Sequence, residues 1–323
     1  MPAPLLEWNY CYPFYSPGFI GFQGMSFKSI LLALLAVCII GLNYPVIKVA
    51  LVDLPPLLLA AIRFTLISVP LVFFCPFPKT SIANVVAIGF FLEFLSLGLM
   101  YYALKSDVQA GVASLLMQSQ VLFTLLLCAL LFEDRINRRQ CFGLLIAVIG
   151  FSIFFYSADK GGSTTAKGFF LMMGAGLSWA IANLVFRRMS GVNLLHLMVW
   201  ASLVPPIPLL VMSLAFESHT PWVLISHTNI ETWLSIIYQA FIVTLLGYIL
   251  WGDLMRRYSS VRIAPFGLLV PIIGIIGSSI ILSESLSGVE WWASFLVLSG
   301  ITLCVIKFRD RNPREKCSGM VGS

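Results

Sequence analysis

Two charged residues, Arg63 and Glu93, lie deep inside apolar stretches of this 323-residue sequence. Arg63 belongs to the stretch at about 56–75, and Glu93 belongs to the stretch at about 82–103. A charge in the middle of a long apolar segment is costly, so it faces a polar interior or a partner. At about 1.5 Å per helical residue, both charges fall near mid-segment on roughly one level. We therefore expect Arg63 and Glu93 to face one shared interior and to pair.

Each of these two residues suits a different task in handling a small charged molecule. A guanidinium binds a carboxylate through paired hydrogen bonds, so Arg63 is a candidate for attracting a substrate carboxylate. A buried carboxylate can have its pKa raised toward neutrality, so Glu93 is a candidate for taking up a proton. Two alternatives stay open: a purely structural ion pair, and a Glu93 that faces a crevice without any coupling role.

A set of uncharged polar and aromatic residues lies near the middle of the same kind of stretch. An uncharged amide can hold an ammonium or a carboxylate without burying a charge. Each of these residues can equally serve as a hydrogen bond between helices. Gln118 and Gln120 do not share one helix face, so we expect one to line a cavity and the other to bond a neighbouring helix. The candidate substrate-binding or translocation set, beyond the two charges, is Asn43, Gln118, Gln120, Trp179, Asn183, Tyr238, Tyr248 and Trp251.

The composition shows what must position these residues. The chain is 59% hydrophobic and 11% charged, with mean hydropathy +0.95, which excludes an ordinary soluble domain. Its apolar blocks have the length that a helix needs to cross a bilayer, and only helices satisfy their own backbone there. The sequence predicts an all-α membrane protein with ten transmembrane helices at about 28–51, 56–75, 82–103, 109–132, 140–157, 167–188, 194–216, 232–252, 261–283 and 289–307.

The positive charges predict an orientation for these helices. The formal net charge of +6 arises from Lys and Arg in short connectors, so we expect no nucleic-acid partner. With the N-terminus inside, fifteen of these cations lie in inner segments and four, Lys48, Lys105, Lys160 and Lys167, in outer ones. This bias predicts that both termini are cytoplasmic. The seven cysteines form no CxxC pair and no metal-like spacing with the three histidines, so we expect small buried hydrophobes and no metal site.

The two halves of the chain resemble each other. Ala113 begins a segment that ends in Glu133, and Ala264 begins one that ends in Glu284, at a common spacing of 151 residues. The segment from Gly41 to Lys48 likewise corresponds to the one ending at Arg187. Five helices per half place the halves in the membrane in opposite senses, which is typical of secondary transporters. We expect two inverted five-helix repeats at 28–157 and 167–307, with Glu133 inside and Glu284 outside.

At these positions the chain resembles the EamA family of the drug/metabolite transporter superfamily. The resemblance rests on Gly41–Lys48 with Pro55, Pro56 and Ala60–Phe64, on Ala110–Leu115 with the two glutamines, and on Arg262–Pro265 with Leu268–Pro271. It covers about 26–308 and implies ten helices in two inverted repeats. It also implies export across the inner membrane of amino-acid metabolites such as cysteine or O-acetylserine. Glu93 departs from the small or neutral polar residue expected there, which bears on both substrate and coupling.

The termini and the remaining function classes complete the expectations. Residues 1–27 are expected to form a tail, with Met25 as an alternative initiator, and residues 308–323 a basic cytoplasmic tail. Motifs for ATP, other cofactors or common hydrolases are missing from the sequence, so we expect no cofactor. A drug/metabolite exporter or an importer of another substrate class is the main alternative, and a membrane-embedded enzyme or a receptor is less favoured. A small-molecule substrate, the lipid bilayer and protons are the expected partners; monomer and homodimer both stay open.

Overall fold

The computed structural model describes residues 25–132, 134–158, 162–189, 191–258 and 260–305. Within these ranges the chain is helical apart from short links, and its β-structure is one isolated bridge between Val108 and Thr164. Nine helical segments there are long and apolar enough to cross a membrane, and a tenth, Pro56–Leu71, is apolar but shorter. These ten segments agree with the ten helices predicted from the sequence, and the chain is an all-α membrane protein.

The ten segments are numbered here as spans 1 to 10, in chain order. Several of them consist of more than one helix, because a span is interrupted by a break or by a π-helical turn. The first five are α1 (Phe27–Ala50), α2 (Pro56–Leu71), α3–η1–α4 (Ile82–Ile88, Gly89–Ser96, Leu97–Ser106), α5–α6 (Ala110–Leu116, Ser119–Phe132) and α7 (Arg138–Ala158). The second five are α8 (Ala166–Arg187), α9–α10 (Leu194–Ala201, Pro206–Phe216), α12–η2–α13 (Ile230–Ile237, Tyr238–Gly247, Tyr248–Arg257), α14–α15 (Ser260–Gly267, Leu269–Leu282) and α16 (Gly288–Val305). The short helix α11 (Pro221–Ser226) lies between spans 7 and 8.

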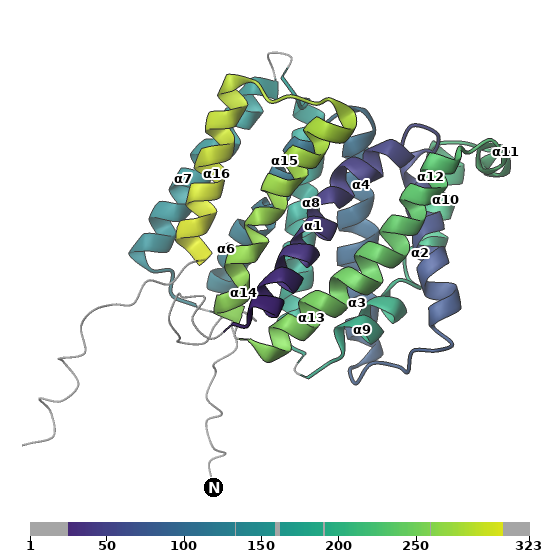
Figure 1. The fold of residues 1–323 in the computed structure, drawn as a ribbon, viewed down its shortest axis with the longest axis horizontal. Helices are drawn as coiled ribbons and strands as arrows, with labels where there is room; N and C mark the ends of the chain where they lie inside the picture. Colours follow the sequence, from purple (N-terminus) through teal and green to yellow (C-terminus); the bar gives the residue numbers. More distant parts are fainter. Residues whose placement is uncertain (1–24, 133, 159–161, 190, 259, 306–323) are drawn as a thin grey trace, which may run out of the picture.

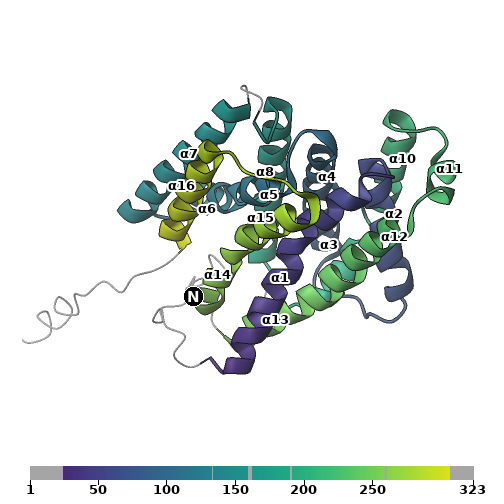
Figure 2. The same ribbon diagram turned by 45° about the horizontal axis from the view of Figure 1, so that its top comes forward.

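The packing of the spans has the symmetry that two inverted repeats require. Span 1 packs along α15 of span 9, and span 6 packs along α6 of span 4, so equivalent helices exchange partners between the halves. Spans 5 and 10 pair with each other at one edge of the molecule, where α7 and α16 lie side by side in both views (Figures 1 and 2). Because five spans per half is an odd number, the second half enters the membrane from the opposite face.

The interruptions within the spans follow the same symmetry. The π-helices η1 and η2 occur in spans 3 and 8, the third spans of the two halves. Spans 4 and 9 are broken at Met117–Gln118 and at Leu268, and the helices after the breaks, α6 and α15, both have 14 residues. π-Helical turns cost hydrogen-bond geometry and are found mainly at functional sites. Spans 3, 4, 8 and 9 are therefore the candidates for positioning a site.

Acidic side chains hold the helix starts at the end of the molecule that is drawn at the top of Figure 1, here called the upper end. It comprises the links at 51–55, 107–109, 162–165, 217–229 and 283–287. Glu217 accepts hydrogen bonds from the backbone of Leu57 and Leu58 at the start of α2, and Glu284 accepts one from Ala110 at the start of α5. Negative charge at a helix N-terminus satisfies unpaired N–H groups and the helix dipole. The acids thus connect neighbouring spans.

Small residues allow a close contact between α7 and α16. A side chain at Gly143 would lie 2.6 Å from the carbonyl oxygen of Gly300, and one at Gly300 would lie 2.5 Å from the backbone of Ala147. Gly143, Ala147 and Gly300 therefore allow the backbones of α7 and α16 to approach each other. The expectation for the cysteines is only partly correct, because Cys128 is buried but Cys141 is exposed on the outside of α7, which in a membrane is a lipid-facing position.

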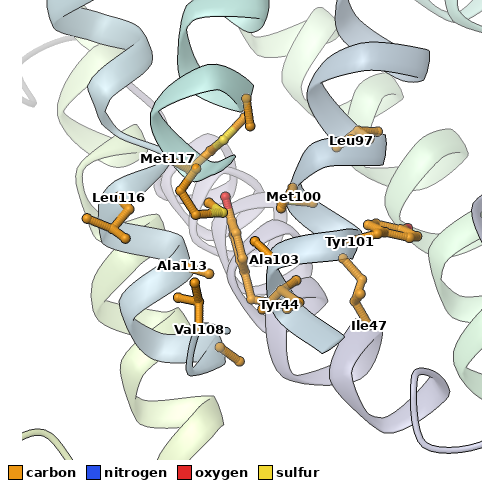
Figure 3. Close-up of a cluster of buried hydrophobic side chains, with 14 of the residues drawn as sticks. Tyr44, Ile47, Leu97, Met100, Tyr101, Ala103, Val108, Ala113, Leu116 and Met117 are labelled. Atoms are coloured by element: carbon orange, nitrogen blue, oxygen red, sulfur yellow. The ribbon is translucent and has the colours of Figure 1, made fainter. Parts of the chain in front are cut away.

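The largest buried core is mainly aliphatic; spans 1 to 6 contribute most of it, and spans 7, 8 and 10 add further residues. Figure 3 shows Tyr44 extending between α4 and α5 toward Met117, while Tyr101 points to the other side of α4. Tyr101 is fully buried even though it carries a hydroxyl group. A buried hydroxyl needs hydrogen-bond partners, so the far side of α4 must hold polar groups.

Candidate functional site

The partners of Tyr101 form a buried polar cluster around Arg63. The Arg63 guanidinium, which is 3% exposed, donates through Nη1 to the Tyr101 hydroxyl oxygen at 2.5 Å. Its Nη2 donates to Thr244 Oγ1 at 3.4 Å. Tyr101 in turn donates to Gln239 Oε1. The cluster joins spans 2, 3 and 8, which are remote in sequence, and we call Arg63, Tyr101, Gln239 and Thr244 the arginine cluster.

The π-helix η2 explains how span 8 supplies two of these groups. Gln239 and Thr244 are five residues apart, and Thr244 Oγ1 donates to the Gln239 carbonyl oxygen at 3.1 Å. The wider turn of a π-helix brings residues at this spacing to one side. Both residues then reach the cluster, Gln239 with its amide and Thr244 with its hydroxyl. Neither was among the sequence candidates.

The arginine cluster keeps two unused hydrogen-bond donors. Arg63 Nε and Gln239 Nε2 are buried and have no partner. Buried polar groups are nearly always satisfied, so an unpartnered donor calls for an explanation such as a ligand or ordered water. Two free N–H donors beside a fixed positive charge match the oxygen atoms of a carboxylate, which accepts from guanidinium and amide groups. The cluster is chemically suited to an anionic ligand.

Glu93 lies in η1 of span 3 and contacts span 7 rather than Arg63. It is 3% exposed, and Ser202 Oγ, at the end of α9, lies 3.0 Å from its Oε1. The ion pairs of the described residues do not include an Arg63–Glu93 pair, so the expected pairing is wrong at contact distance. Because Arg63 bonds Tyr101 and Thr244 instead, its geometry is fixed by spans 3 and 8.

The surroundings of Glu93 can accommodate a proton. Ser202 Oγ is also 2.8 Å from the carbonyl oxygen of Met198, and a hydroxyl has a single hydrogen to share between these acceptors. A charged Glu93 takes that hydrogen, whereas a protonated Glu93 donates to Ser202 while Ser202 donates to Met198. Glu93 Oε2 is buried and has no partner. The site therefore offers hydrogen-bond partners for both protonation states.

Of three other sequence candidates, two make hydrogen bonds between helices and one has a buried acceptor without a partner. Tyr238 donates to the carbonyl oxygen of Ile39 at 2.8 Å, and Asn183 donates to Thr124 Oγ1 at 3.0 Å, so both connect spans. Asn43 is buried and its Oδ1 has no partner. These contacts favour a helix-joining role for Tyr238 and Asn183 and leave Asn43 as a candidate for substrate contact.

The aromatic and amide candidates take several different places. Gln118 is buried at the break between α5 and α6, while Gln120, two residues further on in α6, is half-buried. Trp179 is half-buried against the aliphatic core. Trp251 packs with Leu254 and its neighbours near the end of the molecule opposite the upper end, here called the lower end, and away from the arginine cluster. The side chain of Tyr248 lies outside the described residues, as does all of Glu133.

Four functional candidates were missed in the sequence: Tyr101, Ser202, Gln239 and Thr244. The only feature of the sequence that could have indicated them is that each is a polar residue several positions inside an apolar span. Ser, Thr and Tyr in such spans commonly bond their own helix or a neighbour, so type and position alone do not single them out. Gln239 was the strongest signal, because an amide inside a membrane span is rare and costly.

Comparisons with known proteins bear on this site. The sequence model of the EamA-like transporter family matches residues 27–156 and 166–306. A probable amino-acid metabolite efflux pump of Salmonella typhimurium is 37% identical over 293 residues, covering 89% of this chain and 98% of that protein. A protein of the same description from Escherichia coli is 34% identical over 292 residues, with the same coverage of both. One solved structure, described only as "Crystal structure of protein", has a TM-score of 0.56 at 16% identity and covers 85% of this chain and 95% of that one. The last likeness concerns the fold alone.

Proposed function

The chain belongs to the EamA-like transporter family, and from this premise we propose that it exports small amino-acid metabolites such as cysteine or O-acetylserine. Transport would proceed by alternating access between the two inverted halves, across the inner membrane. The relatives described as efflux pumps support the direction and the substrate class. An E. coli relative described as an inner membrane transporter, 22% identical over 283 residues, supports the location.

The observation that carries this proposal is the arginine cluster. Amino-acid metabolites share an α-carboxylate, whatever their side chain. Arg63 is a fixed, buried positive charge, and its Nε and Gln239 Nε2 are free donors. A carboxylate that entered here would accept both hydrogen bonds and neutralise the buried charge. Asn43 and Gln118 are the candidates for contacts with the rest of the substrate.

Glu93 carries the second part of the proposal, exchange of substrate for protons. An acidic residue inside a membrane span is a functional candidate by default. Glu93 is buried and has hydrogen-bond partners for both protonation states. A proton taken up from outside and released inside would drive export against the substrate gradient. Neither ATP nor another cofactor is needed for this cycle.

The orientation is part of the proposal as well. The excess of Lys and Arg in segments at the lower end supports cytoplasmic termini. A fluorescent-protein fusion at the C-terminus should fluoresce, and an alkaline-phosphatase fusion there should be inactive, because the enzyme matures only outside the inner membrane. The opposite result for the two fusions would invert the assigned direction of every span.

Uptake into proteoliposomes tests the substrate class. Purified protein should move labelled cysteine or O-acetylserine, and a pH gradient should change the rate. Unlabelled cysteine should compete, whereas cysteamine, which lacks the carboxylate, should not. If cysteamine competes as strongly as cysteine, the substrate carboxylate is not recognised, and the proposed role of the arginine cluster is wrong. Failure of both labelled compounds to move would remove the amino-acid reading and leave a transporter of another substrate class.

A further inference from the structure

An ion pair ties three spans together at the upper end. Lys48, near the end of α1, lies 2.7 Å from Glu284 Oε1, just after α15. Lys48 Nζ also donates to the carbonyl oxygen of Val108 at 2.9 Å, and Glu284 Oε2 accepts from the backbone N–H of Ala110 at 2.8 Å. One pair of side chains therefore holds the ends of spans 1 and 9 against the start of span 4.

A second ion pair ties two spans together at the lower end. Arg187, the last residue of α8, lies 3.1 Å from Asp134 Oδ2, just after α6. The Arg187 guanidinium also stacks over the Phe132 ring at 3.9 Å and donates to Cys128 Sγ at 3.6 Å. This pair holds the ends of spans 6 and 4 together. Span 4 is thus contacted at both ends, at its start by hydrogen bonds from the Lys48–Glu284 pair and at its end by the Arg187–Asp134 pair.

The two ion pairs occupy equivalent positions in the two halves. Lys48 follows the first residue of α1 by 21 positions, and Arg187 follows the first residue of α8 by the same number. Glu284 lies two residues after the end of α15, and Asp134 lies two residues after the end of α6. The helix bounds thus give Asp134 the position in the first half that Glu284 has in the second. The two halves therefore carry the same signs of charge at these positions: a cation near the end of the first span and a carboxylate just after the fourth.

Each pair joins the two halves, because spans 1 and 4 belong to the first half and spans 6 and 9 to the second. If a solute passes between spans 1 and 9 at the upper end, or between spans 6 and 4 at the lower end, the pair at that end has to break. The Lys48, Glu284 and Arg187 side chains are 25%, 12% and 13% exposed, and Asp134 is 35% exposed. Such partly buried pairs hold while closed, and water solvates both charges once the helices separate.

We infer that Lys48–Glu284 and Arg187–Asp134 are the two gates of the transport cycle, related by the inverted repeat and opened in alternation. The inference rests on the proposed function for its biological meaning, but its test needs no substrate. Weakening one gate favours the state that is open at that end. If the two ends open in alternation, the same change must also favour closure at the other end, because raising the population of one of two states lowers the population of the other.

Hydrogen–deuterium exchange of the full chain in nanodiscs tests this coupling. We compare Lys48→Gln and Arg187→Gln with Arg257→Gln, which removes an ion pair to Asp253 within a single helix. Lys48→Gln should raise exchange at the start of α5 by roughly fivefold and lower it at the end of α6. Arg187→Gln should do the reverse. Arg257→Gln should leave both regions unchanged.

The outcomes separate a gate from a local contact. A rise at the mutated end without a fall at the opposite end means local fraying, and overturns the inference. No change at either end overturns it too. The double variant Lys48→Glu with Glu284→Lys restores the attraction with the charges exchanged, so it should return exchange toward the wild-type pattern at both ends. Reciprocal exchange without amino-acid transport would sustain the gates while refuting the proposed substrate.

Discussion

The hydroxyl of Tyr101 accepts a hydrogen bond from the guanidinium of Arg63 at 2.5 Å, across 38 positions of sequence and between two membrane spans. The same hydroxyl donates to Gln239, so one phenolic oxygen joins spans 2, 3 and 8. The arrangement fixes the orientation of the guanidinium while leaving its Nε free. The guanidinium is thus oriented by Tyr101 and Thr244, and it makes no ion pair with Glu93.

Replacing Tyr101 with Phe should uncouple Arg63 from Gln239 without changing the volume of the core. The buried Nη1 group loses its acceptor, and we expect the free energy of unfolding to fall by about 1–3 kcal/mol. Transport should fall as well, because the guanidinium loses its alignment. Melting of the purified protein and proteoliposome uptake measure the two effects. Tyr102→Phe, at a position 40% exposed, is the control and should leave both unchanged.

Arg63→Gln should reduce affinity for a carboxylate substrate by about 10- to 100-fold, since a hydrogen bond to a charged group contributes about 1.5–3 kcal/mol. The loss should appear in the Michaelis constant for cysteine or O-acetylserine. Arg257→Gln removes the same charge at an exposed position and serves as the control. Substrate affinity that is unaffected in Arg63→Gln, in a protein that still melts normally, would mean that the carboxylate binds elsewhere.

Glu93→Gln should abolish the response of transport to a pH gradient while retaining some exchange of substrate for substrate. The amide keeps the shape and the hydrogen bond with Ser202 but cannot exchange a proton at physiological pH. Uptake at matched and unmatched pH across the liposome membrane measures this response. Glu231→Gln, an exposed acid at the start of α12, is the matched control. A pH response that persists in Glu93→Gln would assign the proton to another group.

Asp53 should make the protein less stable in acid. The backbone N–H of Asn229 is the main cause that lowers the Asp53 pKa, and the Thr232 hydroxyl adds to it. A lowered folded-state pKa gives stability that is present above the unfolded value of about 3.9 and lost as pH falls toward the folded value. Asp53→Asn should therefore melt lower than wild type at pH 7, and the difference should shrink progressively as the pH falls below about 4. A difference that is constant with pH would exclude a role for the charge.

Gly300→Ala should separate α7 from α16. The added carbon would lie 2.5 Å from two backbone atoms, Ala147 N and Gly143 O, and backbone cannot move aside cheaply. We expect a loss of about 1–3 kcal/mol, measured by melting in detergent. Gly288→Ala, where nothing lies within 4 Å, should be close to neutral. Equal melting temperatures for the two variants would contradict the close contact described here.

Much of the fold follows from local properties of the chain. Hydropathy over about twenty residues decides whether a segment spans a bilayer, and so the ten spans and the resemblance between the halves could be predicted within a few residues. The cost of a charge in lipid likewise singled out Arg63 and Glu93. These inferences need no knowledge of which span lies beside which.

Pairing between spans could not be predicted, because each partner is chosen by geometry across the whole bundle. Arg63 bonds Tyr101 and Thr244 rather than Glu93, since the wider turn of η2 brings span 8 to it. Asp134, two residues after the end of α6, meets Arg187 at the end of span 6, a pairing that no local property of the sequence indicates. Apolar length and burial cost are local properties, so the membrane spans and the positions of the costly charges can be predicted from the chain alone. Hydrogen bonds act over about 3 Å between spans that are far apart in sequence, so the partners of those charges become known only once the bundle is assembled.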